Sequence, residues 1–154
     1  MLYFAYGSNM HRAIMRKHAP HAEPVGVATL ADYRFIVTAD GYASVAPAAG
    51  ENVHGLVWRL TPPDRVMLDA WENVAGGLYR AETLPIEQSG KLSPALVYVA
   101  RERPIGWPRL GYMELVIEAA RLLELPADYI SSLQDWLPKD TADTAGQPRF
   151  GEFG

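Results

Sequence analysis

Glu72 is the residue in this sequence best placed to transfer protons. It falls in the last turn of a helix expected from residue 62 to about residue 73, where the helix dipole disfavours a carboxylate. Trp71 beside it and Leu68 four residues earlier make one flank of Glu72 apolar. The dipole and partial burial both raise the pKa of a carboxyl group toward neutrality, where a general acid or base works best.

The charged neighbours of Glu72 allow a second interpretation. A carboxylate at a helix end is commonly solvated, and here it can pair with Arg65 or Arg80. Asp69 lies three residues before Glu72 and is expected to share its helix face. Asp69 then either supports the pKa of Glu72 or bonds to nearby backbone, and the sequence leaves both roles open.

A Gly-Ser-Asn corner near the start of the chain is the second chemical feature. An apolar strand over residues 2–6 breaks at Gly7, Ser8 and Asn9, where a helix can begin. Backbone N–H groups at such a corner lack intrahelical partners and can bind an anionic oxygen, which a glycine lets approach closely. The alternative is a tight turn with Ser8 or Asn9 as the helix N-cap. Ser8 as a nucleophile needs a neighbouring base, and the local sequence supplies none.

The elements that must position these residues alternate irregularly. Strands are expected over residues 2–6, 25–39 with a bend near 31–32, 42–46, 53–60, 79–87 and 94–101. The last two are expected to pair across a turn at Ser89-Gly90-Lys91. Helices are expected up to residue 18 and over residues 62–73, 110–125 and 126–136, with Thr61 as an N-cap. The helix over 110–125 is expected to bury Leu115, Ala119, Leu122 and Leu123. This order predicts an α+β fold in which about six strands can curl into a small barrel.

Composition narrows the class of protein. The 154 residues fit one domain, expected over residues 1–137, followed by an extended or disordered tail over 138–154 that is rich in Thr, Asp, Gly and Pro. The net charge of −4 and the scattered basic residues argue against nucleic-acid binding. No apolar stretch approaches the roughly 20 residues of a membrane span.

The lack of cysteine excludes thiol catalysis, thiolate metal sites and disulfides, and fits a cytoplasmic protein. The histidines show no metal-ligand spacing, so no metal site is predicted; they are His11, His18, His21 and His54.

The motifs and their order resemble the γ-glutamylcyclotransferase-like (AIG2-like) family. The segments that carry the resemblance are Tyr6-Gly7-Ser8-Asn9-Met10, Leu68-Asp69-Ala70-Trp71-Glu72 and Tyr79-Arg80. Further agreement lies at residues 26–28, 32–34, 53–57 and 111–112, so the resemblance covers about residues 1 to 136. It implies a small mixed β-barrel of about six strands, flanked by helices.

The resemblance also implies an activity: cyclising a small γ-glutamyl amide to 5-oxoproline with release of the amine, without metal or cofactor. Glu72 is then the general acid/base. The implied substrate-binding residues are Tyr6, Gly7, Ser8, Asn9, Tyr79 and Tyr112. Taken by itself, Tyr112 is equally well explained as a packed tyrosine whose hydroxyl does not reach a ligand.

Three questions stay open at this point. The same fold also serves as a non-catalytic module, here one that would bind a small anion. Asn73 stands where many relatives have glycine, although asparagine also adopts the left-handed conformation. The loop over residues 103–107 is the best sequence-based choice for the leaving-amine pocket, and the protein is expected to be a monomer or homodimer.

Overall fold

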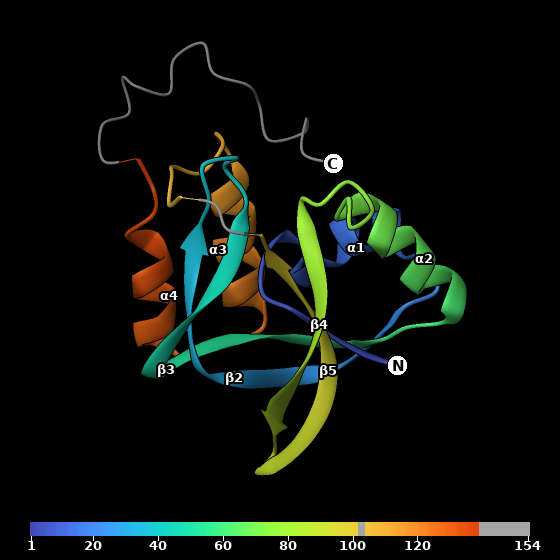
Figure 1. The fold of residues 1–154 in the computed structure, drawn as a ribbon. Coiled ribbons are helices and arrows are strands. Elements are labelled where there is room, and N and C mark those ends of the chain that lie inside the picture. Colours follow the sequence, from blue (N-terminus) through green and yellow to red (C-terminus); the bar gives the residue numbers. More distant parts are fainter. Residues whose placement is uncertain (102–103, 139–154) are drawn as a thin grey trace.

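Five strands form a closed barrel in the computed structural model, which describes residues 1–101 and 104–138 (Figure 1). The strands are β1 (Leu2–Ala5), β2 (Glu23–Val37), β3 (Ala43–Arg59), β4 (Tyr79–Gln88) and β5 (Lys91–Ala100). They follow the order β1-β3-β2-β4-β5, and β1 closes the barrel by pairing in parallel with β5. The expected tail lies, from residue 139 onward, outside the described residues.

The strand count corrects the sequence-based expectation of about six. Residues 43–59 form one continuous strand, not two strands separated by a turn. Gly50, with φ of 79°, lies opposite Asp32 of β2, with φ of 63°, and donates its N–H to the Asp32 carboxylate at 2.9 Å. This paired irregularity bends β2 and β3 together, so their ladder continues where a turn was expected.

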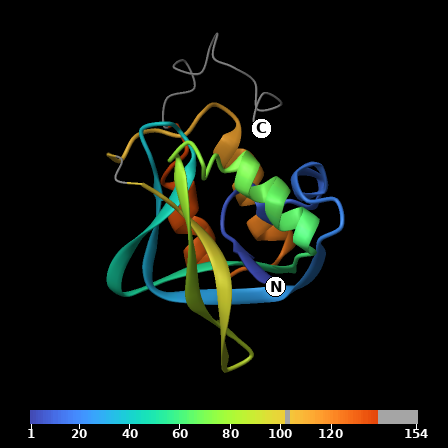
Figure 2. The same cartoon turned by 45° about the vertical axis from the view of Figure 1, so that its right-hand side comes forward.

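The expected hairpin between β4 and β5 is confirmed. Its two-residue connection, Ser89 and Gly90, has φ values of 51° and 78°, as a type I′ turn requires. The hairpin projects away from the helices in both ribbon views (Figures 1 and 2).

In the described part of the chain, four α-helices and one 3₁₀ turn cover the barrel. They are η1 (Ser8–Met10), α1 (Arg12–His18), α2 (Pro62–Trp71), α3 (Tyr112–Leu122) and α4 (Ala127–Gln134). Helix α1 packs against α2, and α3 packs against α4 (Figure 2). Thr61 is the N-cap of α2, as expected, and forms a capping box with Asp64. Within the described residues, no helix is long and apolar enough to cross a membrane.

One expectation about α3 is wrong. Leu122 is 74% exposed, although Leu115 and Ala119 are buried as expected. The stripe of α3 that packs on the barrel runs through Val116 and Ala120. At about 100° per residue, Leu122 lies on the side of the helix opposite that stripe.

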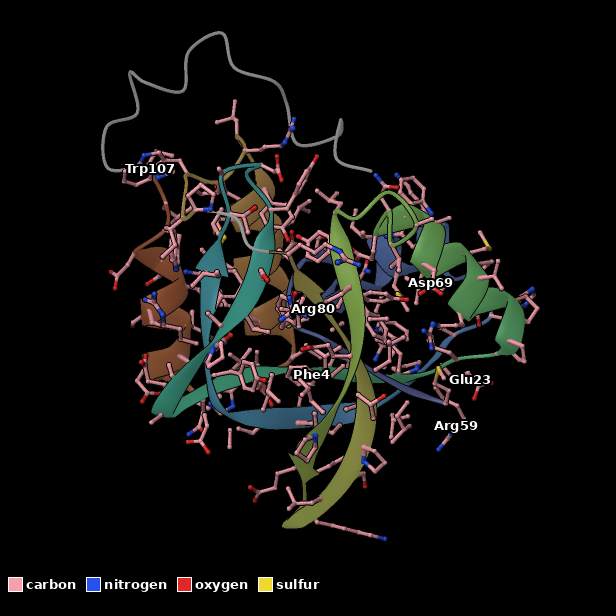
Figure 3. The ribbon with its side chains drawn as sticks, in the orientation of Figure 1. Phe4, Glu23, Arg59, Asp69, Arg80 and Trp107 are labelled. Carbon is pink, nitrogen blue, oxygen red and sulfur yellow. The ribbon has the colours of Figure 1, made fainter. Side chains whose placement is uncertain are left out.

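The barrel interior is a tightly packed apolar core. Phe4 of β1 is fully buried at its centre (Figure 3). Gly55 of β3 pairs close beside Ala5, and a Cβ on Gly55 would lie 2.2 Å from the Ala5 carbonyl oxygen. Glycine therefore lets β1 approach β3, which fixes the strand that leads directly into the Gly7 corner.

Candidate active site

All seven residues predicted for the site line one cavity of about 320 Å³. They are Tyr6, Gly7, Ser8, Asn9, Glu72, Tyr79 and Tyr112. They come from the end of β1, the η1 turn, the end of α2, the start of β4 and the start of α3. The fold thus brings together residues that lie more than one hundred positions apart in the sequence.

Glu72 is the C-cap residue of α2 and keeps its helix geometry, with φ of −80° and ψ of 0°. Its side chain is half-buried and has no ion pair within the described residues. Arg65 instead pairs with Asp69 at 3.0 Å, and Arg80 pairs with Glu82 at 2.9 Å. The interpretation of Glu72 as a solvated, paired helix-end carboxylate is therefore wrong.

The environment of Glu72 shifts its titration. Burial raises the pKa of this carboxyl group to about 7, so both protonation states are populated near neutral pH. Burial also raises the pKa of Tyr112 to about 12, and the negative charge of Glu72 adds to that increase. The same two causes raise the pKa of Tyr3, Tyr6 and Tyr79. These hydroxyls therefore stay protonated, and neutral, at physiological pH.

Asn73 forms the turn after Glu72, as expected. Asn73 adopts the left-handed conformation, with φ of 49°, and its Oδ1 accepts a hydrogen bond from the N–H of Gly76 at 3.2 Å. The N–H of Glu72 itself remains bonded to the Leu68 carbonyl at 2.9 Å. The end of α2 is thus well ordered, and Glu72 is held by backbone on both sides.

The Gly-Ser-Asn corner forms a 3₁₀ turn. The N–H groups of Met10 and His11 bond back to the carbonyls of Gly7 and Ser8, at 3.1 and 2.9 Å. Those two bonds leave the N–H groups of Ser8 and Asn9 outside the ladder of the turn. The N-cap of α1 is His11, without a side-chain cap, so the interpretation of Ser8 or Asn9 as the α1 cap is wrong.

The backbone of Ala43 ties two of the predicted tyrosines together. Tyr112 accepts a hydrogen bond from the Ala43 N–H at 3.3 Å, and Tyr79 donates to the Ala43 carbonyl at 2.6 Å. Hydrogen bonds with Ser8 also reach the Tyr112 hydroxyl. A Cβ on Gly7 would lie 2.8 Å from that hydroxyl oxygen, so glycine is needed for Tyr112 to reach the corner.

Tyr6 and Asn9 line the cavity with their polar atoms already bonded to protein groups. The Tyr6 hydroxyl donates to the backbone carbonyl of Tyr98. The Asn9 side chain donates to the Tyr3 hydroxyl at 3.0 Å and lies 2.8 Å from Nδ1 of His18. These two residues therefore shape and stiffen the wall of the cavity.

Sequence reasoning missed several residues that line the cavity. They are Tyr3, Ile14, His18, Tyr42, Ala43, Trp71, Leu78, Tyr98 and Leu115. The spacing of Ile14 and His18, four residues apart on one helix, is the signal that identifies one face of α1. Ala43 and Tyr98 act through backbone atoms, which residue type does not reveal.

Asp69 does not share the environment of Glu72. Its carboxylate accepts hydrogen bonds from Arg65 and from the Tyr98 hydroxyl, the latter at 2.7 Å. Its role is therefore to join α2 to β5. The sequence left open support for the pKa of Glu72 or a bond to nearby backbone, and the carboxylate instead bonds to these two side chains.

The loop chosen for the leaving amine lies elsewhere. In the described part of this loop, residues 104–107, no side chain lines the Glu72 cavity, and Trp107 borders a second hollow beside α4. Figure 3 shows Trp107 on the opposite side of the molecule from Asp69 of α2. Within the described residues, no group of three or more His, Asp or Glu side chains could hold a metal ion.

Comparison with known proteins places this site in a family. Residues 3–114 match the model of the family described as "Gamma-glutamyl cyclotransferase, AIG2-like". The chain belongs to this family. The match includes the Gly7 corner, the Glu72 segment and Tyr112, so it covers every residue predicted for the site.

Curated relatives that match this chain over most of their length are named γ-glutamylcyclotransferase. A γ-glutamylcyclotransferase of Homo sapiens is 27% identical over 150 residues, which cover 90% of this chain and 80% of that protein. One of Bos taurus is 29% identical over 154 residues, with the same coverage. These matches support a function of the γ-glutamylcyclotransferase type for this member of the family.

Solved structures show the same architecture. A structure named "Gamma-glutamyl cyclotransferase" has a TM-score of 0.84 at 26% identity and covers 91% of this chain and 89% of its own. YkqA from Bacillus subtilis has a TM-score of 0.77 at 24% identity and covers 97% of this chain but 55% of its own. The predicted α+β barrel flanked by helices is thus confirmed, with five strands among the residues that the structure describes.

Proposed function

We propose that the protein cyclises a γ-glutamyl amide to 5-oxoproline and releases the amine, with Glu72 as the general acid/base. The observation that carries this proposal is the state of the Glu72 carboxyl group. It lines the cavity, it forms no ion pair with any described residue, and burial raises its pKa to about 7. Such a group can both accept and return a proton at neutral pH.

The reaction needs few protein groups because the substrate supplies its own nucleophile. Glu72 takes a proton from the α-ammonium group, and the free amine attacks the γ-carbonyl carbon to close a five-membered ring. The amide C–N bond then breaks as the proton held by Glu72 passes to the departing nitrogen. The ring nitrogen gives up its remaining extra proton, which Glu72 can accept and pass on, so the amine leaves as an ammonium ion. The atoms of the γ-glutamyl amide are thus divided between 5-oxoproline and the free amine, and no other reactant is consumed. Holding the folded conformer supplies much of the rate enhancement.

The corner formed by Gly7, Ser8 and Asn9 supports the polar end of the substrate. Its N–H groups outside the turn ladder suit the α-carboxylate or the oxyanion that develops on the γ-carbonyl oxygen. The neutral hydroxyls of Tyr79 and Tyr112 lie in the same cavity and are anchored to Ala43. We assign these two side chains to substrate orientation.

The test is turnover of a panel of γ-glutamyl amides, followed by detection of 5-oxoproline. Glu72→Gln keeps the size of the side chain and is expected to lower kcat about 10²- to 10⁴-fold. Calorimetry is expected to show that 5-oxoproline still binds this variant. Asp69→Asn is the matched control, because it removes a carboxylate from the same helix at a position bonded to Arg65 and Tyr98.

The outcomes separate the enzyme from a binding module. Release of 5-oxoproline by wild type and Asp69→Asn, but not by Glu72→Gln, establishes the mechanism. A Glu72→Gln enzyme with near-normal turnover refutes the role of Glu72. No release from any amide, with 5-oxoproline still bound, identifies a non-catalytic module that binds a small anion.

We also propose that residues 1–137 act as one domain in the cytoplasm, as a monomer or homodimer. The cysteine-free composition supports a reducing compartment. Light scattering coupled to size-exclusion chromatography measures the oligomeric state directly.

A further inference from the structure

Trp71 is an exposed aromatic residue in the lining of the Glu72 cavity. It is the last residue of α2, it lines the cavity, and 45% of its surface is exposed. A large aromatic side chain left this open next to a reactive carboxylate offers apolar surface to whatever enters the cavity.

The position of Trp71 is fixed by a buried polar chain. Its ring stacks on that of His18, with centroids 4.2 Å apart and an interplanar angle of 32°. His18 is buried, and its Nδ1 lies 2.8 Å from Oδ1 of Asn9, which in turn donates to Tyr3 at 3.0 Å. One side of the indole therefore packs on a chain of hydrogen-bonded groups that leads back to β1, and the rest of the ring stays exposed.

Three more apolar side chains, each from a different segment of the chain, line the same cavity. Ile14 comes from α1, Leu115 from α3, and Leu78 from the segment before β4. The polar lining comes instead from the Gly7 corner, Glu72 and the tyrosine hydroxyls. The glutamyl half of the substrate is charged and suits the polar lining, which leaves the apolar lining for the amine half.

We propose that Trp71, together with Ile14 and Leu115, is the recognition wall for the leaving amine, and that the preferred substrates are γ-glutamyl amides of amines bearing an aromatic or apolar group. This inference rests on the proposed cyclotransferase reaction. It assigns Trp71 to specificity, and it keeps Glu72 for the proton transfer.

The test compares kcat/KM for γ-glutamylbenzylamide and γ-glutamylmethylamide. Wild type is expected to favour the benzylamide about 10- to 100-fold, because the ring packs on the indole. Trp71→Ala is expected to reduce this preference to about threefold or less, through loss on the benzylamide. Trp71→Phe keeps an aromatic ring against His18 and is expected to retain most of the preference. Comparing the preference between variants cancels the different intrinsic reactivity of the two amides.

Two different results would contradict the inference, and they distinguish a failure of amine recognition by Trp71 from a failure of the proposed reaction. If Trp71→Ala loses the same factor on both amides, or none on either, Trp71 does not recognise the amine although the enzyme turns over. If wild type releases no 5-oxoproline from any γ-glutamyl amide, the proposed function fails, and this inference fails with it.

Discussion

The hydroxyl oxygen of Tyr112 lies 2.8 Å from the point where a Cβ atom would stand on Gly7. That hydroxyl is buried and bonded to Ala43, so it has little freedom to move away. Gly7→Ala is expected to displace the tyrosine, costing about 1–3 kcal/mol of stability and about 100-fold in kcat/KM.

A double-mutant cycle checks this prediction about Gly7. Tyr112→Phe removes the clashing oxygen, and the next ring atom lies 4.0 Å from the added Cβ. The combined variant is therefore expected to lose less stability than the sum of the two single variants. Strictly additive losses in chemical denaturation contradict the proposed contact.

Glu72 is expected to reduce stability above mildly acidic pH. Its pKa rises from 4.5 in the unfolded chain to about 7 in the folded protein, through burial. Below pH 4.5 the group is protonated in both states and costs nothing. Between these two pH values the unfolded state ionises first, so stability falls with rising pH and then levels off above about 7.

Glu72→Gln removes this dependence on pH. The free energy of unfolding of this variant minus that of wild type is expected to be about 2 kcal/mol larger at pH 8 than at pH 4.5. This is less than the whole pKa shift of Glu72 would give, because Glu72 is only half-buried. Denaturant titrations of both proteins at the two pH values measure the change. A difference that is constant with pH shows that the pKa is not raised.

The rate of the reaction is expected to follow the same titration. In the proposed reaction the carboxylate form of Glu72 accepts the first proton, so kcat/KM is expected to rise about tenfold per pH unit up to about pH 7. A pH profile on one γ-glutamyl amide measures this limb. A limb centred near pH 4.5 means that the site does not raise the pKa of Glu72 in solution.

Gly55 is expected to tolerate no side chain. A Cβ at this position would lie 2.2 Å from the Ala5 carbonyl oxygen and 3.0 Å from the Phe4 ring. Gly55→Ala is expected to cost more than about 3 kcal/mol, because β1 must separate from β3. Gly50→Ala is the control: nothing lies within 4 Å, and only its φ of 79° is unfavourable, at about 1 kcal/mol. Equal melting temperatures for the two variants contradict the close approach.

Asp69 is expected to matter for stability and little for catalysis. Asp69→Ala leaves the Tyr98 hydroxyl and Arg65 without their carboxylate partner. The expected cost is about 1–2 kcal/mol, with the lower value favoured because the ion pair is partly exposed. At a temperature where the variant is folded, kcat is expected to stay within about threefold of wild type. A loss as large as that of Glu72→Gln places Asp69 in the reaction.

The sequence correctly predicted those parts of the fold that depend on interactions between residues close together in the chain. The N-cap at Thr61, the Ser89-Gly90 hairpin and the bend near Asp32 each depend on a few neighbouring residues. The single strand β3 was not predictable in this way, because Gly50 is held by Asp32 of another strand. When only its sequence neighbours are considered, a glycine in a polar segment such as Gly50 indicates a turn.

The same division applies to the site. Glu72 and the Gly7 corner carry local signals, a helix end and a chain reversal, and family resemblance supplied the rest. The junction at Ala43 has no such signal, since its tyrosine partners lie 36 and 69 residues away in the chain. Trp71 belongs to a pattern that fits an ordinary buried helix face, and only its exposure beside the cavity sets it apart.

The barrel closes through one parallel pair, Tyr3 with Leu96, and β1 is otherwise held by pairs such as Tyr3 with Trp58. These partners follow Tyr3 by 93 and 55 residues, the differences of the paired numbers. On the ribosome, β1 and the Gly7 corner therefore emerge long before the strands that hold them, and the corner takes its final form only after β5 has been synthesised. The candidate active site is therefore expected to assemble late, so a chain stopped before residue 96 has every polar residue of the corner and no finished pocket.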